Sequence, residues 1–211
     1  MPDINIGILA IQGDIEENID ATTKAISSLS VKGNVVPVRY HDDLKKINGL
    51  ILPGGESTAI GHILALNSNM SCTLQERLLN GMPTLGICAG MIVLAKKAYD
   101  IVVGEMNQHL LNVFDIVIER NSFGRQHESF ETDLPIEGLG TDLFKGVFIR
   151  APSVKSVGSH VRILGRLAEK IVAVQQGNLI GTSFHPELSD DIRFHKRLIQ
   201  LIADSKKTTE A

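Results

Sequence analysis

Cys88 stands in a sequence context that could make it a nucleophile. It lies between Gly86 and Gly90 in the pattern Gly-x-Cys-x-Gly, directly after the apolar run Thr84–Ile87. Small flanking residues permit a sharp turn from a strand into a helix, and such a turn exposes the nucleophile at the helix N-terminus. The helix dipole there favours the thiolate, which is the reactive form of cysteine. A free cysteine is more often a buried apolar residue, but the glycine frame favours the nucleophile here.

A cysteine nucleophile needs a base, and His185 could supply it. Pro186 restricts His185 to an extended conformation, in which side chains two positions apart project to the same side. Glu187 could therefore orient the imidazole, as the acid does in a Ser-His-Asp triad. A metal site made of Cys88, His185 and Glu187 is disfavoured, because no further ligand cluster would complete the usual four-coordinate sphere.

The other histidines lack such a frame, and we expect them to be solvated or hydrogen-bonded loop residues. They are His41, His62, His109, His127, His160 and His195.

The segment Pro53–Ser57, with the sequence PGGES, is the third segment that could take part in the chemistry. Its paired glycines would let backbone N–H groups approach a substrate closely. Aimed at a developing oxyanion, one such donor contributes about 10²–10³ in rate. Ser57 could at the same time cap a helix. A phosphate-binding loop is disfavoured, because no Gly-Lys-Ser/Thr follows.

Alternating strand and helix patterns predict how these segments are positioned. The first half predicts strands at 4–11, 35–38, 50–52 and 84–87, and helices at 16–29, 58–66, 73–79 and 91–98. The second half predicts strands at 113–119, 147–149, 161–167, 171–175 and 179–184, a hairpin turn at 176–178 and a closing helix at 190–203. We expect an α/β fold with a mostly parallel central sheet, helices on both faces and additional antiparallel strands in the second half. The three candidate segments each follow a strand, where open α/β sheets bind ligands.

Composition excludes several other classes of protein. The 211 residues are 43% hydrophobic and carry a net charge of −3 without a block of one sign, so neither a nucleic-acid stripe nor a polybasic membrane patch is expected. The only two cysteines, Cys72 and Cys88, do not form a Cys-x-x-Cys pair, which favours a reducing, cytoplasmic setting. We expect Cys72 to be buried.

The ends of the chain and its apolar runs set further expectations. The N-terminus lacks the basic region of a signal peptide, and no apolar run reaches the ~18 residues that suggest a membrane span. We expect one domain over 1–204, followed by a polar, frayed tail at 205–211.

Five segments resemble the class I glutamine amidotransferases, and more closely the glutaminase subunit of pyridoxal 5′-phosphate synthase, the PdxT family. In order along the chain they are ILPGGEST, GICAGMIVLAKK, LLNVFDIVIERNSFGRQ, GVFIRAP and GTSFHPEL. The resemblance implies the flavodoxin-like fold of this class and a triad of Cys88, His185 and Glu187. It also implies hydrolysis of L-glutamine to glutamate and ammonia, with no cofactor and no metal.

The resemblance further implies how glutamine is held. The substrate-binding residues would be Gly55, Glu56, Ser57, Arg120, Ile149 and Arg150, and the backbone N–H groups of Gly55 and Ala89 would bind the oxyanion. An amino acid head group needs an acid for its ammonium and donors for its carboxylate. Outside this context the two arginines would be ordinary solvated charges. The segment Gln12–Asp14 is expected to touch the partner or the mouth of the site.

The implied partner is a synthase subunit of the PdxS family. It would receive ammonia without release to bulk water and build pyridoxal 5′-phosphate from ribose 5-phosphate and glyceraldehyde 3-phosphate. Assemblies of this family contain twelve of each subunit, and the glutaminase is activated by docking. Three alternatives stay open: a glutaminase serving another synthase, a non-catalytic docking or regulatory module, and a cysteine hydrolase of the DJ-1-like kind. The complete triad disfavours the second, and the His-Pro-Glu sequence disfavours the third.

Overall fold

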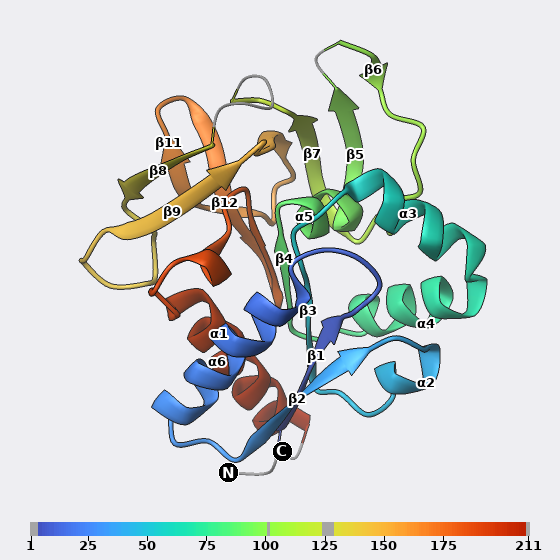
Figure 1. Ribbon diagram of the computed structural model, residues 1–211, viewed down its shortest axis with the longest axis vertical. Helices are drawn as coiled ribbons and strands as arrows, with labels where there is room; N and C mark the ends of the chain where they lie inside the picture. Colours follow the sequence, from blue (N-terminus) through green and yellow to red (C-terminus); the bar gives the residue numbers. More distant parts are fainter. Residues whose placement is uncertain (1–3, 101, 124–128, 210–211) are drawn as a thin grey trace.

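The computed structural model describes residues 4–100, 102–123 and 129–209. Its strands are β1 (Ile4–Leu9), β2 (Gly33–Val38), β3 (Gly49–Leu52), β4 (Thr84–Ile87), β5 (Ala95–Asp100), β6 (Gly104–Glu105), β7 (Phe114–Arg120), β8 (Ser129–Leu134), β9 (Phe144–Ile149), β10 (Ser153–Val157), β11 (Arg162–Leu167), β12 (Lys170–Gln176) and β13 (Leu179–Thr182). Eleven of these described strands form one mixed sheet in the order β2-β1-β3-β4-β13-β12-β10-β7-β5-β6, with β11 paired to β12 (Figure 1). Strands β8 and β9 form a separate antiparallel pair.

Five neighbouring strands, β2-β1-β3-β4-β13, run parallel to one another. Parallel strands covered on both faces need apolar side chains throughout, and β3, β4 and β13 are buried at every position. This order is the flavodoxin-like doubly wound arrangement, which confirms the predicted fold class. Because β3, β4 and β13 are adjacent and parallel, the segments that follow them meet at one edge of the sheet.

Helices cover both faces of the sheet (Figure 1). They are α1 (Ile15–Ser28), α2 (His41–Leu44), α3 (Ser57–Leu66), α4 (Ser68–Leu79), α5 (Ala89–Leu94) and α6 (Arg193–Thr209), with a 3-10 helix η1 (Pro186–Leu188). Helices α1 and α6 pack against one face, where Ile26 and Leu198 belong to the same apolar cluster. Helices α2 to α5 contribute Leu44, Ile60 and Leu74 to a second cluster on the other face. No helix within the described part of the chain is long and apolar enough to cross a membrane.

Two helices extend beyond their predicted bounds. Helix α4 begins at Ser68, not at residue 73, because the Asn67 side chain accepts a hydrogen bond from the backbone N–H of Met70 at 3.1 Å. Helix α6 continues to Thr209, so the prediction of a frayed tail is wrong for residues 205–209; residues 210–211 lie outside the described part. Cys72 on α4 is exposed, so the expectation that it is buried is also wrong. The division into one domain and a tail stays a prediction.

The predicted helix at 91–98 is wrong in its second half. Helix α5 ends at Leu94, and the chain continues directly into β5. A register shift in the pairing of β5 with β7 between Ala95 and Lys97 marks a β-bulge. The bulge leaves Ala95 and Ala98 buried and the two intervening lysines exposed. Apolar residues three apart in a bulged strand imitate the spacing of a helix, which explains the error.

The antiparallel strands predicted for the second half are present, including the β12–β13 hairpin around 176–178. Strands β6, β8 and β10 and helix α2 were not predicted. In β8 only Leu134 is buried, so this strand carries little apolar pattern by which to recognise it.

Candidate active site

The chain makes a strained turn at Cys88 between β4 and α5. Its backbone has φ 48° and ψ −101°, a conformation that residues with a Cβ rarely adopt and that is often found at functional sites. The Cys88 N–H donates a hydrogen bond to the carbonyl oxygen of Thr182 at 2.7 Å, which fastens the turn to the end of β13. Cys88 is therefore a largely buried residue held at the edge where the parallel strands end.

The two glycines around Cys88 are required by packing. A Cβ on Gly86 would lie 2.6 Å from Cδ1 of Leu94 and 3.0 Å from the backbone nitrogen of Met91. A Cβ on Gly90 would overlap the carbonyl oxygen of Leu52 at the end of β3. The small residues on either side of Cys88 thus allow α5 to pack directly on β3 and β4.

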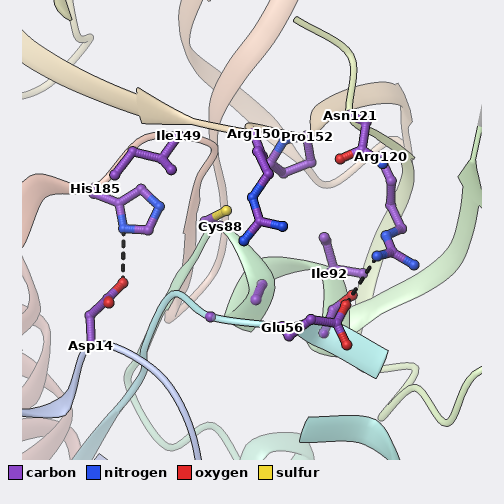
Figure 2. Close-up of a pocket in the computed structure, with 13 residues that line it drawn as sticks. Asp14, Glu56, Cys88, Ile92, Arg120, Asn121, Ile149, Arg150, Pro152 and His185 are labelled. Atoms are coloured by element: carbon purple, nitrogen blue, oxygen red, sulfur yellow. Dashed lines mark hydrogen bonds and ion pairs between the residues drawn. The ribbon is translucent and has the colours of Figure 1, made fainter. Parts of the chain in front are cut away.

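His185 follows β13, the strand next to β4, and its backbone is extended, as its place before proline predicts. Its Nδ1 forms a hydrogen bond with Oε1 of Glu187 at 2.9 Å. A second carboxylate also reaches this ring, since Oδ2 of Asp14 lies 3.2 Å from Nδ1 (Figure 2). The Cys88 side chain also interacts with the imidazole and contributes to its raised pKa.

These contacts determine the protonation of His185. Burial acts to lower its pKa, but the hydrogen bonds with Asp14, Cys88 and Glu187 outweigh burial and raise the pKa to about 12. The hydrogen bond from His185 in turn lowers the pKa of Asp14. The ring is accordingly an imidazolium at neutral pH, placed between two carboxylates and the thiol group.

Cys88 and His185 open onto a pocket of about 160 Å³ at the carboxyl ends of the strands (Figure 2). It is lined by Asp14, Gly55, Glu56, Ser57, Cys88, Ala89, Ile92, Arg120, Asn121, Ile149, Arg150, Pro152 and His185. Every residue predicted to bind glutamine or its oxyanion is in this set. Glu187 lies behind His185, outside the lining. The predicted residues therefore come together in one place, although they derive from five separate segments of the chain.

Comparison with known proteins identifies the family. The model of the SNO glutamine amidotransferase family matches residues 8–204. The chain belongs to this family. The PdxT subunit of pyridoxal 5′-phosphate synthase from Nitrosopumilus maritimus (strain SCM1) is 46% identical over 202 residues, covering 96% of this chain and 98% of that protein. The corresponding subunit from Aeropyrum pernix is 46% identical over 203 residues, covering 94% and 99%. A crystal structure of a glutamine amidotransferase superposes with a TM-score of 0.79 at 40% identity, covering 94% of this chain and 98% of that one.

These relationships confirm the prediction of a glutamine amidotransferase of the PdxT type. They count against a DJ-1-like cysteine hydrolase and against a glutaminase for an unrelated synthase. The catalytic and binding roles predicted for individual residues do not follow from these similarities and stay predictions.

In this SNO family glutamine amidotransferase, two predicted substrate-binding residues contact each other. Nη2 of Arg120 lies 3.1 Å from Oε1 of Glu56 in the pocket lining, and Nη1 of Arg120 donates to Oγ1 of Thr58 at 3.3 Å. Oε2 of Glu56 accepts a hydrogen bond from the N–H of Ala59 at 2.9 Å, so Glu56 caps α3, and not Ser57 as expected. The hydroxyl of Ser57 donates instead to Oε1 of Gln108 at 3.4 Å.

Two further pocket residues have left-handed backbones. Arg150 has φ 45° and extends its guanidinium into the pocket (Figure 2). Asn121 has φ 54° and donates from Nδ2 to Oδ2 of Asp100 at 3.1 Å. Asn121 was not predicted as a pocket residue. Its neighbours at 124–126, in the motif that carried much of the resemblance, lie outside the described residues.

The segment Gln12–Asp14 was expected to touch either the partner or the mouth of the site. Its residue Asp14 lines the pocket, in agreement with the second expectation. Oε1 of Gln12 accepts a hydrogen bond from the N–H of Glu56 at 2.8 Å. Asp14, His185 and Glu187 place three possible metal-ligand atoms within 4.8 Å of one another. Both carboxylates already bind Nδ1 of the imidazole, so a cation there would have to replace the ring proton that joins them.

Three of the described histidines lie on helices and not in loops as predicted: His41 begins α2, His62 lies on α3, and His195, which alone of the three is buried, lies on α6. His195 is 1% exposed, and its Nε2 is 3.4 Å from Oδ1 of Asn18. Burial lowers the pKa of His195 to about 4, so the ring is neutral. His109 is a hydrogen-bonded loop residue, as expected, with Nε2 2.8 Å from Oγ of Ser71. His127 lies outside the described residues.

Proposed function

We propose that Cys88, His185 and Glu187 form the catalytic triad with which this glutamine amidotransferase hydrolyses L-glutamine to glutamate and ammonia. The observation that carries the proposal is the position of Cys88. It occupies a strained turn at the end of β4, and His185 follows the adjacent parallel strand and is already hydrogen-bonded to Glu187. A nucleophile, a base and an orienting acid in this order are the groups that covalent catalysis by a cysteine needs.

The reaction has two halves. The Sγ thiolate of Cys88 attacks the carboxamide carbon of glutamine, forming a C–S bond. As the tetrahedral intermediate collapses, the His185 imidazolium gives its proton to the leaving nitrogen, and the C–N bond breaks to release ammonia. The neutral imidazole then takes a proton from water, which attacks the thioester carbon. The C–S bond breaks, giving glutamate and restoring the thiolate–imidazolium pair, while Glu187 holds the ring orientation throughout.

The pocket offers complementary groups for the amino acid head of glutamine. We propose that Glu56 accepts the ammonium and that Arg120 and Arg150 bind the carboxylate. The existing ion pair between Glu56 and Arg120 would then open, each partner exchanging the other for a group of opposite charge on the substrate. Gly55, Ser57 and Ile149 would complete the walls beside them.

The oxyanion of each tetrahedral intermediate needs donors fixed in advance. We propose the backbone N–H groups of Ala89 and Gly55 for this role. Ala89 is the first residue of α5, and the N–H groups of a first helical turn have no partner within their own helix. Gly55 lines the same pocket, at a place where Gln12 and the backbone of Gly13 leave no space for a side chain.

The relatives are named as subunits of pyridoxal 5′-phosphate synthase, and we propose the same partnership for this chain. Ammonia would pass from the pocket to a PdxS-type synthase subunit without release to bulk water. Twelve copies of each subunit would assemble in the cytoplasm, and docking would activate the glutaminase. The Gln12–Asp14 turn, at the mouth of the pocket, is the proposed point of contact.

The test is glutamate release from glutamine, measured with and without a PdxS-type subunit. We expect release that depends on the partner in the wild type and falls by at least about 10³-fold in Cys88→Ala, because the covalent route is lost. The matched control is Cys72→Ala, since Cys72 is the exposed cysteine on α4. Full activity in Cys88→Ala, or equal losses in both variants, would refute the triad. Release that does not respond to the partner would refute activation by docking.

A further inference from the structure

Asp14 occupies the first position before helix α1 but does not behave as a helix cap. An aspartate at this position usually accepts a hydrogen bond from the next helical turn, which stabilises a helix by about 1 kcal/mol. The Asp14 side chain accepts none from the described first turn of α1. Its carboxylate points instead across the mouth of the pocket to His185, with Oδ2 3.2 Å from Nδ1 (Figure 2).

The backbone of Asp14 is fixed to the glycine loop. Its N–H donates to the carbonyl oxygen of Gly54 at 3.1 Å. A Cβ on Gly54 would overlap Cε1 of His185 and lie 2.7 Å from Oδ2 of Asp14, so the three residues are in close contact. The backbone hydrogen bond to Gly54 thus holds Asp14 in place. Because Gly54 has no side chain, the Asp14 carboxylate has room to reach the imidazole.

We propose that Asp14 is a positioning residue of the glutaminase: together with Glu187 it holds the imidazolium of His185 facing Cys88. The inference rests on the proposed triad and adds a second acid to it. The ionisable groups around the ring are Asp14 from the β1–α1 turn, Cys88 from the β4–α5 turn and Glu187 from η1, with Arg150 elsewhere in the pocket lining. The raised pKa of His185, to which Asp14 contributes through its hydrogen bond, supports this arrangement.

The two acids have different roles because their surroundings differ. The side chain of Glu187 has no exposed surface, whereas that of Asp14 is 36% exposed. Glu187 therefore fixes the ring from the interior. Asp14 supplies a second negative charge from the solvent side, where water partly screens it. Removing that charge should leave the ring held by Glu187 alone and make the imidazolium easier to deprotonate.

The experiment is the pH dependence of kcat/KM for glutamine in the complex with the synthase subunit, for wild type, Asp14→Asn and Asp14→Ser. We expect the alkaline limb of both variants to move at least about one pH unit lower, because the imidazolium loses a charged partner. Asp14→Ser can also cap α1, so its thermal stability should be kept while its profile shifts. The matched control is Asp20→Asn, an exposed acid on the same helix, which should leave the profile unchanged.

A second readout separates this inference from the triad itself. Nitrogen NMR of the His185 ring, followed against pH, reports the imidazolium directly and needs no turnover. We expect the ring of Asp14→Asn to deprotonate at least about one pH unit below the wild type. The proposal would be overturned if the variants lost rate equally at every pH while the alkaline limb of the kcat/KM profile and the titration of the His185 ring stayed where they are in the wild type. Asp14 would then have a merely structural role. A loss of rate that saturating synthase subunit fully restores would limit Asp14 to the docking contact proposed for its turn, and would overturn the positioning role. If the ring titration shifts in Asp14→Asn but the wild-type protein shows no glutaminase activity, the contact between Asp14 and His185 would be upheld and the triad refuted.

Discussion

Nδ1 of His185 and Oε1 of Glu187 are 2.9 Å apart, and this hydrogen bond is enclosed by the protein. The Glu187 side chain has no exposed surface, and its other oxygen, Oε2, has no hydrogen-bond partner among the described residues. A buried carboxylate is costly unless it is paired. The charge of Glu187 is therefore matched to a protonated ring, and the ring orientation depends on that charge.

The first prediction follows from this pair. Glu187→Gln keeps the shape of the side chain and removes its charge, so the imidazolium loses its interior partner and the ring its preferred orientation. We expect kcat for glutamine hydrolysis to fall by up to about 10⁴, the loss seen when the orienting acid of a Ser-His-Asp triad is replaced by its amide. Steady-state glutamate release with the synthase subunit measures it. Glu169→Gln, at an exposed site, should be unchanged, and a kcat for Glu187→Gln within threefold of the wild type would contradict the assignment.

The second prediction concerns Gly90 in the first turn of α5. Glycine to alanine in a helix ordinarily stabilises a protein by up to about 1 kcal/mol. Here the added Cβ would overlap the carbonyl oxygen of Leu52, and forcing extra volume into a packed site costs about 1–3 kcal/mol. The cost of overpacking should exceed the gain in helix propensity. We therefore expect Gly90→Ala to lower the melting temperature by several degrees and to displace Cys88.

The control for Gly90→Ala is Gly104→Ala. Gly104 has φ 85° and open space around its Cβ position, so the substitution tests backbone strain without a clash. Strain of this kind costs about 1–2 kcal/mol. The two variants should differ in activity: Gly104→Ala keeps the full kcat, while Gly90→Ala loses most of it. Unchanged kcat and stability in Gly90→Ala would show that the turn at Cys88 adapts freely.

The third prediction concerns the Glu56–Arg120 ion pair. Both side chains reach solvent, so the pair should contribute only about 0–1 kcal/mol to stability. As the proposed partner of the substrate ammonium, however, Glu56 contacts glutamine in both the ground state and the transition state. We expect Glu56→Gln to raise KM about 10- to 100-fold with little change in kcat or melting temperature.

The exposed pair of Glu131 with Lys145, 3.1 Å apart, offers the matched control. Glu131→Gln removes a similar surface ion pair outside the pocket lining and should alter neither KM nor stability. If Glu56→Gln lowered kcat and left KM unchanged, Glu56 would act on the chemical step and not on binding of the head group.

The residues of the proposed triad could be expected to meet from sequence alone, because each has a local signal. The Gly-x-Cys-x-Gly frame and the His-Pro-Glu segment each follow a recognisable apolar strand, and parallel strands bring such segments to one edge. The contact of Asp14 with His185 has no such signal, since 171 positions separate the two along the chain. It exists only because β1 and β13 lie in one sheet and Gly54 leaves room between them. The same limit applies to Gln108 behind Ser57, a contact made by an irregular loop.

The last prediction concerns stability and pH. Burial lowers the pKa of His195 to about 4 in the folded protein, whereas an unfolded histidine has a pKa near 6.5. Between these values the unfolded chain binds a proton that the folded protein does not, so stability falls as pH decreases from about 6.5 to 4. A shift of this size corresponds to about 3 kcal/mol at full effect. The raised pKa of His185 acts oppositely: the stability it provides is present below about pH 6.5 and is lost as pH rises toward about 12.

Urea unfolding at pH values from 4.5 to 6.5 separates the contribution of His195. We expect the free energy of unfolding of the wild type to rise with pH, approaching the limit of about 1.4 kcal/mol per pH unit for one proton. His195→Gln should be less stable at pH 7, because the amide has more hydrogen-bonding groups than a neutral imidazole and the buried site offers one weak partner, Asn18. Its stability should vary less with pH over this window, since no imidazole remains to be charged. The control His62→Gln, at an exposed site on α3, should keep the wild-type slope. An equal slope in all three proteins would mean that carboxylates, and not the buried His195, govern the acid sensitivity of the fold.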